Sequence, residues 1–177
     1  MKRLGLLRHA KSDWDDMSLR DFDRGLNARG RKGAKLMGDH IRDHGGSWDL
    51  VLASPAERVK LTLEASDLDV PVRYEESAYL ADSPTLIQLL ASHADAADSV
   101  LMMGHNPGLQ ELALDLVAPT AENDLFEEVM QKYPTAAFAV LELDIEDWRD
   151  LAPGCGKIVH FARPRDLDPE LGPLRAG

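Results

Sequence analysis

Apolar segments of strand length alternate along this chain with longer segments of helical periodicity, and this alternation constrains the fold more than any other feature. The pattern is typical of βα units around a mainly parallel sheet. The expected strands cover residues 2–7, 49–53, 70–74, 99–103, 136–143 and 157–162. The expected helices cover residues 28–44, 55–68, 84–94, 107–116 and 125–131. We therefore expect an α/β fold with a mostly parallel central sheet and helices on both faces.

The length of the chain fits one domain, since 177 residues lie within the usual range for a single hydrophobic core. We expect this domain to span residues 1–162. Residues 163–177 contain three prolines and two glycines, a composition that favours irregular surface structure. This segment is expected to form an extended C-terminal tail.

Several of the expected helices have marked starts. Ser54-Pro55, Ser83-Pro84 and Asn106-Pro107 each place a capping side chain before a proline, whose fixed φ suits the first helical position. Glu57 follows Ser54 at the spacing of a capping box. We expect these side chains to cap their helices.

The net charge excludes some classes of function. The formal charge of −11 argues against a protein that coats nucleic acid, which usually needs a basic face. No apolar run approaches the roughly 18 residues of a membrane span, and charged residues come too early for a signal peptide. Cys155 is the only cysteine, which excludes an intrachain disulfide and a multi-cysteine zinc site. We expect a soluble, cytoplasmic protein without a nucleic-acid or membrane partner.

Basic and imidazole side chains follow three of the expected strands. Arg8 and His9 follow the first strand, Arg58 follows the second within the segment SPAER, and His105 follows the fourth within GHNPG. In parallel α/β sheets the functional groups gather beyond the carboxyl ends of the strands, so these side chains should share one crevice. Arginine offers paired donors that match phosphate oxygens, and helix amino termini attract anions. The pattern predicts a pocket for a phosphoryl group.

These three motifs resemble the histidine phosphatase superfamily, which includes phosphoglycerate mutases and acid phosphatases. The sequence is most similar to the small SixA-type phosphohistidine phosphatases, through the segments LLRHAKSDW, DFDRGLNARGRKGA, SPAERVKLT and MMGHNPGL. The resemblance extends to about residue 116. It implies a phosphoglycerate-mutase-like fold and a phosphatase that forms a transient phosphohistidine.

The resemblance also implies roles for individual residues. His9 would be the nucleophile, and Arg8, Arg58 and His105 would hold the phosphoryl oxygens, with no metal or other cofactor. The hydroxyl of Ser12 and the backbone near Asn106 would be further donors to the substrate.

Trp14, which lies in the same region of the sequence, would shape the approach of the substrate. The chain also departs from the superfamily pattern, because Ala10 replaces the usual glycine after the Arg-His pair, Lys11 replaces an acidic residue or glutamine, and Gly25 interrupts a DRPLN-like segment.

No acidic residue clearly matches the proton donor of the mutase branch, and Glu75, Glu76 and Asp82 remain equal candidates. A phosphohistidine substrate has a basic leaving nitrogen, so it needs a positioned acid less than an alcohol ester does. The short chain also leaves little sequence for a lid over a small substrate. Both features favour phosphohistidine on a signalling or phosphotransfer protein as the substrate.

Two other functions remain open. A phosphatase of small phosphomonoesters would use one of the acidic candidates as its proton donor, and a phosphate-binding module would keep the pocket without turnover. His40 and His44 have the i, i+4 spacing of a zinc helix but lack the intervening glutamate of a metalloprotease, so we interpret them as part of a helix face.

Overall fold

A six-stranded sheet forms the centre of the molecule in the computed structural model, which describes residues 1–44, 46–94 and 96–172. The strands are β1 (Lys2–Arg8), β2 (Leu50–Ala53), β3 (Val72–Tyr74), β4 (Ser99–Gly104), β5 (Phe138–Leu143) and β6 (Gly156–Ala162). Their order in the sheet is β3-β2-β4-β1-β5-β6. The pairs β3/β2, β2/β4 and β4/β1 are parallel, whereas β5 is antiparallel to both of its neighbours. The expected mostly parallel sheet is confirmed.

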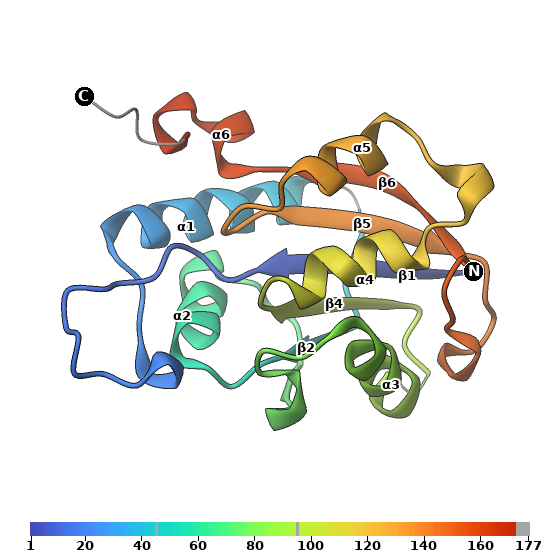
Figure 1. The fold of residues 1–177 in the computed structure, drawn as a ribbon, viewed down its shortest axis with the longest axis horizontal. Helices are drawn as coiled ribbons and strands as arrows, with labels where there is room; N and C mark the ends of the chain where they lie inside the picture. The colour runs from blue at the N-terminus through green and yellow to red at the C-terminus, as the bar shows by residue number, and fades with distance from the viewer. Residues whose placement is uncertain (45, 95, 173–177) are drawn as a thin grey trace.

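Helices cover both faces of this sheet, as the alternation of elements predicted (Figure 1). On one face lie α1 (Ala28–Asp43) and α2 (Glu57–Ser66). On the other lie α3 (Ser83–His93), α4 (Gly108–Leu116) and α5 (Asp124–Gln131). No helix among the described residues combines the length and the apolar character needed to cross a membrane.

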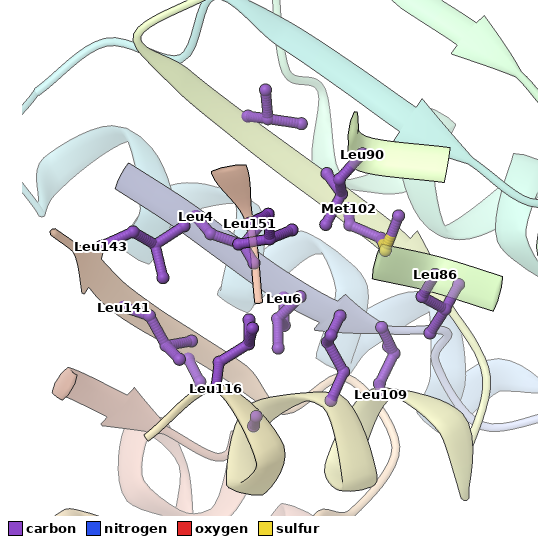
Figure 2. Packing of buried hydrophobic residues seen from close by; sticks show 14 of the residues in the cluster. Leu4, Leu6, Leu86, Leu90, Met102, Leu109, Leu116, Leu141, Leu143 and Leu151 are labelled. Carbon is purple, nitrogen blue, oxygen red and sulfur yellow. The ribbon is translucent and has the colours of Figure 1, made fainter. Parts of the chain in front are cut away.

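Alternate residues of the central strands divide between two apolar layers. Leu4 and Leu6 of β1 face α3 and α4, where Figure 2 shows them among leucines from several elements. Leu7 faces α1 and α2 instead. This alternation follows from the two-residue period of a strand, and it buries the sheet on both sides. The buried strands hold their carboxyl ends in fixed positions.

The start of α2 differs from the expected capping box. The helix begins at Glu57 after Ala56, and no side chain caps it. The hydroxyl of Ser54 instead lies 2.8 Å from Nε2 of His105 and accepts a 3.3 Å hydrogen bond from the backbone N–H of Ala56. The Ser54 hydroxyl, which the local pattern predicts to cap α2, therefore makes a tertiary contact with His105 instead.

The cap expected for α3 is also wrong, whereas Asn106 caps α4 as expected. Asp82, one residue before Ser83, caps α3 by accepting a 3.0 Å hydrogen bond from the backbone N–H of Thr85. In α4 the side-chain oxygen of Asn106 accepts a 3.3 Å hydrogen bond from the backbone N–H of Gln110 in the first turn, and the amide of Asn106 also donates to the backbone carbonyl of Tyr133 at 2.9 Å. Aspartate is as good a cap as serine, so the sequence pattern alone does not distinguish Asp82 from Ser83 as the cap.

The C-terminal segment is not extended over its described part. It forms the short helix α6 (Pro164–Leu167) and a 3-10 turn over Pro169–Leu171. Arg29 of α1 donates hydrogen bonds to the backbone carbonyls of Glu170 and Gly172, which attaches this segment to the domain. Proline at the first helical position favours a helix start, which explains why proline content alone predicted the wrong structure. Residues 173–177 of the expected tail lie outside the described residues.

Candidate active site

The sheet register brings the three sequence motifs to one edge. Arg8 at the end of β1 pairs with Gly104 at the end of β4, and the backbone N–H of His9 donates to the carbonyl of Gly104 at 3.0 Å. On the other side of β4, the backbone N–H of Ser54 donates to the carbonyl of Met103 at 3.1 Å. Residues far apart in the sequence are thus adjacent because the carboxyl ends of three parallel strands are adjacent.

A pocket of about 360 Å³ lies at this edge. All seven side chains predicted from the sequence line it, namely Arg8, His9, Ser12, Trp14, Arg58, His105 and Asn106. Lys11, Asp21, Leu80 and Thr135 also line it. The pocket is strongly basic even though the whole chain carries a net charge of −11.

The hydrogen bonds of His9 determine which of its nitrogens can react. Its Nδ1 lies 2.7 Å from the backbone carbonyl of Ala10, and a carbonyl can only accept, so Nδ1 carries the proton. The Nε2 atom then bears the lone pair, and it has no hydrogen-bond partner among the described residues. Burial, with help from the charges of Arg8 and Arg58, lowers the pKa of His9 from 6.5 to about 4. His9 is therefore a neutral imidazole with a free nucleophilic nitrogen at neutral pH.

A chain of hydrogen bonds connects the other histidine to an arginine and a carboxylate. Arg58 donates to Nδ1 of His105 at 3.2 Å, so Nδ1 is unprotonated and Nε2 donates to the hydroxyl of Ser54 at 2.8 Å. The same arginine donates to the carboxylate of Asp21 at 3.0 Å and to its backbone carbonyl at 2.8 Å. Burial and the charge of Arg58 lower the pKa of His105 to about 3. Arg58 is only 5% exposed, and this network fixes its guanidinium at the pocket.

Asp21 is a site residue that the sequence reasoning missed. It lies in the loop between β1 and α1, and Tyr79 donates a hydrogen bond to the carboxylate oxygen that Arg58 contacts. Burial alone would raise the pKa of Asp21, but the hydrogen bonds from Tyr79 and Arg58 keep it below its usual value. Asp21 is therefore ionised. Only the segment DFDRG could have drawn attention to it, and nothing in that segment distinguishes Asp21 from Asp23.

The guanidinium of Arg8 is held by a backbone carbonyl. It donates to the carbonyl of Tyr133 at 3.0 Å, and the amide of Asn106 donates to the same carbonyl at 2.9 Å. The Nε atom of Arg8 is buried without a hydrogen-bond partner in the described part of the chain. A buried donor without a partner is costly, so it favours the binding of an anion.

The loop after His9 packs tightly between two helices. The hydroxyl of Thr62 in α2 accepts from the backbone N–H of Ala10 at 2.9 Å. Gly30 in the first turn of α1 lies so close to the carbonyl of Lys11 that a Cβ atom there would be 2.2 Å from that oxygen. These contacts fix the backbone that carries His9, and the methyl group of Ala10 is fully buried within them.

Comparison with known proteins indicates the family of this chain. The sequence profile described as the histidine phosphatase superfamily (branch 1) matches residues 4–82, which include Arg8, His9 and Arg58. The uncharacterised protein Rv1276c of Mycobacterium tuberculosis is 36% identical over 160 residues, which cover 90% of this chain and all of that protein. The chain belongs to the histidine phosphatase superfamily.

Two solved structures place it near one group within this superfamily. A candidate phosphohistidine phosphatase SixA from Nakamurella multipartitia has a TM-score of 0.83 and 27% identity, and the match covers 92% of this chain and 96% of that one. A candidate SixA from Agrobacterium tumefaciens has a TM-score of 0.76 and 30% identity, with 92% and 98% covered. The present protein is a SixA-like phosphatase, and its fold is phosphoglycerate-mutase-like.

The rim of the pocket of this histidine phosphatase contains exposed apolar side chains. Trp14 is 58% exposed, and the guanidinium of Arg24 lies 4.1 Å from the centre of its ring. Leu80, in the segment between β3 and α3, is 54% exposed. The hydroxyl of Ser12 has no hydrogen-bond partner among the described residues, so it is available as a donor.

None of the three acidic residues considered for proton donation lines the pocket of the phosphatase. Asp82 caps α3, and Glu75 forms a 2.7 Å ion pair with Arg73. Glu76 begins a 3-10 turn next to it. Asp21 is the only acidic residue among the described residues that line the pocket, and its ion pair with Arg58 keeps it from holding a proton.

Proposed function

We propose that this phosphatase hydrolyses phosphohistidine on a protein substrate, without a metal, through a phosphohistidine formed on His9. The observation that carries the proposal is the state of His9, whose Nδ1 proton is committed to a carbonyl while Nε2 is free in a pocket lined by two arginines. A neutral imidazole in this state is a competent nucleophile, and the arginines supply the charge that a transferring phosphoryl group needs.

The reaction has two displacements. In the first, the lone pair on Nε2 of His9 forms a bond to phosphorus as the bond from phosphorus to the substrate imidazole breaks. In the second, water attacks phosphorus, the bond to Nε2 breaks, and inorganic phosphate leaves. Arg8 and Arg58 stabilise the negative charge on the equatorial oxygens during both displacements. His105 orients Arg58, and it can offer its Nε2–H to an oxygen by giving up its bond to Ser54.

Two features of the pocket support a protein phosphohistidine as substrate. The pocket has an ionised and paired carboxylate but no free acid among its described lining residues, which suits a leaving imidazole whose other ring nitrogen can be protonated before cleavage. The exposed side chains of Trp14 and Leu80 give the rim an apolar surface that a protein can contact. A small, polar sugar phosphate would gain little from contact with this apolar rim.

A label-trapping experiment tests the proposal. A phosphotransfer protein labelled with radioactive phosphate on histidine is mixed with the enzyme, and turnover is stopped with alkaline denaturant, because the phosphorus–nitrogen bond is labile in acid. We expect label on the wild type and on His93→Gln, whose histidine lies outside the pocket, and none on His9→Ala. Release of phosphate by the wild type without any trapped label would overturn the covalent mechanism.

The same preparation distinguishes the other functions. The values of kcat/KM for the labelled protein, p-nitrophenyl phosphate and several sugar phosphates are compared. Preference for sugar phosphates would favour a small-molecule phosphomonoesterase. Phosphate binding without any release of product would favour a non-catalytic module.

A further inference from the structure

Three histidines form a cluster away from the catalytic pocket. His40 lies in the last turn of α1, His44 directly follows that helix, and His160 lies in the edge strand β6. One ring nitrogen from each can be chosen so that all three atoms lie within 4.8 Å of one another. Among residues 1–44, 46–94 and 96–172, no other set of three histidine, cysteine or acidic side chains meets this condition.

The sheet places His160 on the side of α1 by means of an irregularity. Val140 of β5 pairs with His160, but Leu141 pairs with Ile158, so Val159 is an extra residue in β6. A bulge of this kind changes the face to which the flanking side chains point. Ile158 consequently joins the core on one face of the sheet, while His160 contacts Phe138 on the face covered by α1.

The helix is equally well fixed. Gly38 packs so closely on α2 that a Cβ atom there would lie 2.1 Å from the backbone carbonyl of Ser66. The guanidinium of Arg42 donates to the carbonyls of Ser66 and Asp67, which attaches the last turn of α1 to the end of α2. His40 and His44 are therefore presented by a rigid turn, and their i, i+4 spacing puts them on one face.

The nitrogen atoms are close to the spacing that a metal ion requires. Nε2 of His40 lies 2.8 Å from Nε2 of His160, and the ring centres of His44 and His160 are 3.6 Å apart. Ligands of tetrahedral zinc, at about 2.0–2.1 Å from the ion, are roughly 3.3 Å apart. Rotations of the side chains, which separate the His40 and His160 nitrogens and turn the three stacked rings toward a common point, would give this arrangement.

We propose that His40, His44 and His160 bind one divalent transition-metal ion, with Zn²⁺ or Cu²⁺ as the ions best suited to three imidazole nitrogens. Asp43 lies next to the site, and its negative charge, like the net charge of −11, favours a cation.

The bound ion would connect α1 to the edge of the sheet and would not take part in phosphoryl transfer. Gly30, beside the catalytic loop, and His44 lie at opposite ends of α1, about 20 Å apart along the helix. A metal at this distance cannot contact a phosphoryl group on His9. The proposal is therefore independent of the proposed function.

Binding of Zn²⁺ to the full chain, freed of any affinity tag, is measured by calorimetry at pH 7.5, and Co²⁺ absorption reports the coordination. We expect one ion per chain in the wild type and in His93→Gln. Affinity should fall at least tenfold in His44→Gln and be lost in His160→Gln. Because His44 is exposed and outside the pocket, His44→Gln should retain the phosphatase activity of the wild type, which shows that it is folded.

Three results would overturn the proposal. The first is a wild type that binds no ion at micromolar concentration. The second is binding by His44→Gln and His160→Gln that equals the wild type. The third is loss of the ion in His9→Ala, which would locate it in the catalytic pocket instead. If His160→Gln fails to fold, His44→Gln and the ring-proton shifts of His40 on titration with Zn²⁺ give the same decision.

Discussion

The effect of Asp21→Asn on kcat/KM should change sign when Arg58, its ion-pair partner, is also replaced. Arg58→Gln removes a charged donor from the pocket, and loss of one positioned oxyanion donor costs about 10²–10³-fold in kcat, or about 2.7–4 kcal/mol. Asp21→Asn alone removes a charged hydrogen bond that orients Arg58 at 3.0 Å. We expect this to lower kcat/KM by about tenfold, or about 1.4 kcal/mol.

In the Arg58→Gln background, Asp21 becomes an unpaired anion that repels the phosphoryl group. Like charges roughly 4–8 Å apart repel by about 2–4 kcal/mol at an effective dielectric constant of 20. The Asp21 side chain is 43% exposed, so screening by solvent reduces this to about 1–2 kcal/mol. Asp21→Asn should therefore raise kcat/KM about tenfold in that background, although it lowers kcat/KM in the wild type.

The assay is a double-mutant cycle. The value of kcat/KM is measured for the wild type, both single variants and the double variant, and urea midpoints confirm that all four proteins are folded. The two effects of Asp21→Asn should differ in sign, with a coupling energy of about 3 kcal/mol, within the range seen for residues in contact. An equal loss in both backgrounds would refute the electrostatic role assigned to Asp21.

Four further predictions concern pH, metal ions and packing. The pKa of about 4 for His9 keeps its imidazole neutral, so if His9 is the nucleophile the acid limb of kcat/KM should lie well below pH 6.5, and a limb centred at 6.5 would contradict this role. Because His9 and His105 have lowered pKa values when folded, the free energy of unfolding should decrease as pH falls from about 6.5 towards 4, as urea titrations would show. Phosphatase activity should survive EDTA, and a loss restored by Mg²⁺ would favour a metal mechanism. Gly30→Ala should destabilise the protein by about 1–3 kcal/mol and lower kcat, whereas Gly33→Ala, where a Cβ atom meets nothing closer than 3.8 Å, should stabilise it by about 0.5–1 kcal/mol.

The sequence was informative wherever the position of a residue follows from the sheet. Arg8 ends a buried strand and His9 and His105 directly follow buried strands, so a rule about parallel sheets was enough to bring them together. Arg58 needed only the additional expectation that a helix begins soon after β2. Repeated secondary structure explains these successes, because register propagates along the ladder from one strand to the next.

Predictions failed where the role of a side chain depends on a partner that is distant in the sequence. Ser54 could cap α2 or contact His105, and the local pattern cannot reveal that the second partner is 51 residues away. Asp21 has no local signature, because its role depends on Arg58 and Tyr79, which different elements contribute. The position of His160 was not predicted for the same reason, because no sequence feature indicates the bulge at Val159 that turns its side chain toward α1.

The groups that we propose to perform phosphoryl transfer and those that we propose to contact the substrate lie on different parts of the chain. Arg8 is the last residue of β1, and His9 and His105 directly follow β1 and β4, whereas Trp14 and Leu80 lie in connecting segments at the mouth of the pocket. Connecting segments tolerate replacement far better than buried strands do. The contacts with partners can therefore change among relatives of this protein while the reaction stays the same. Grafting the segment around Trp14 onto a relative should transfer the preference for a partner without transferring the rate of phosphoryl transfer.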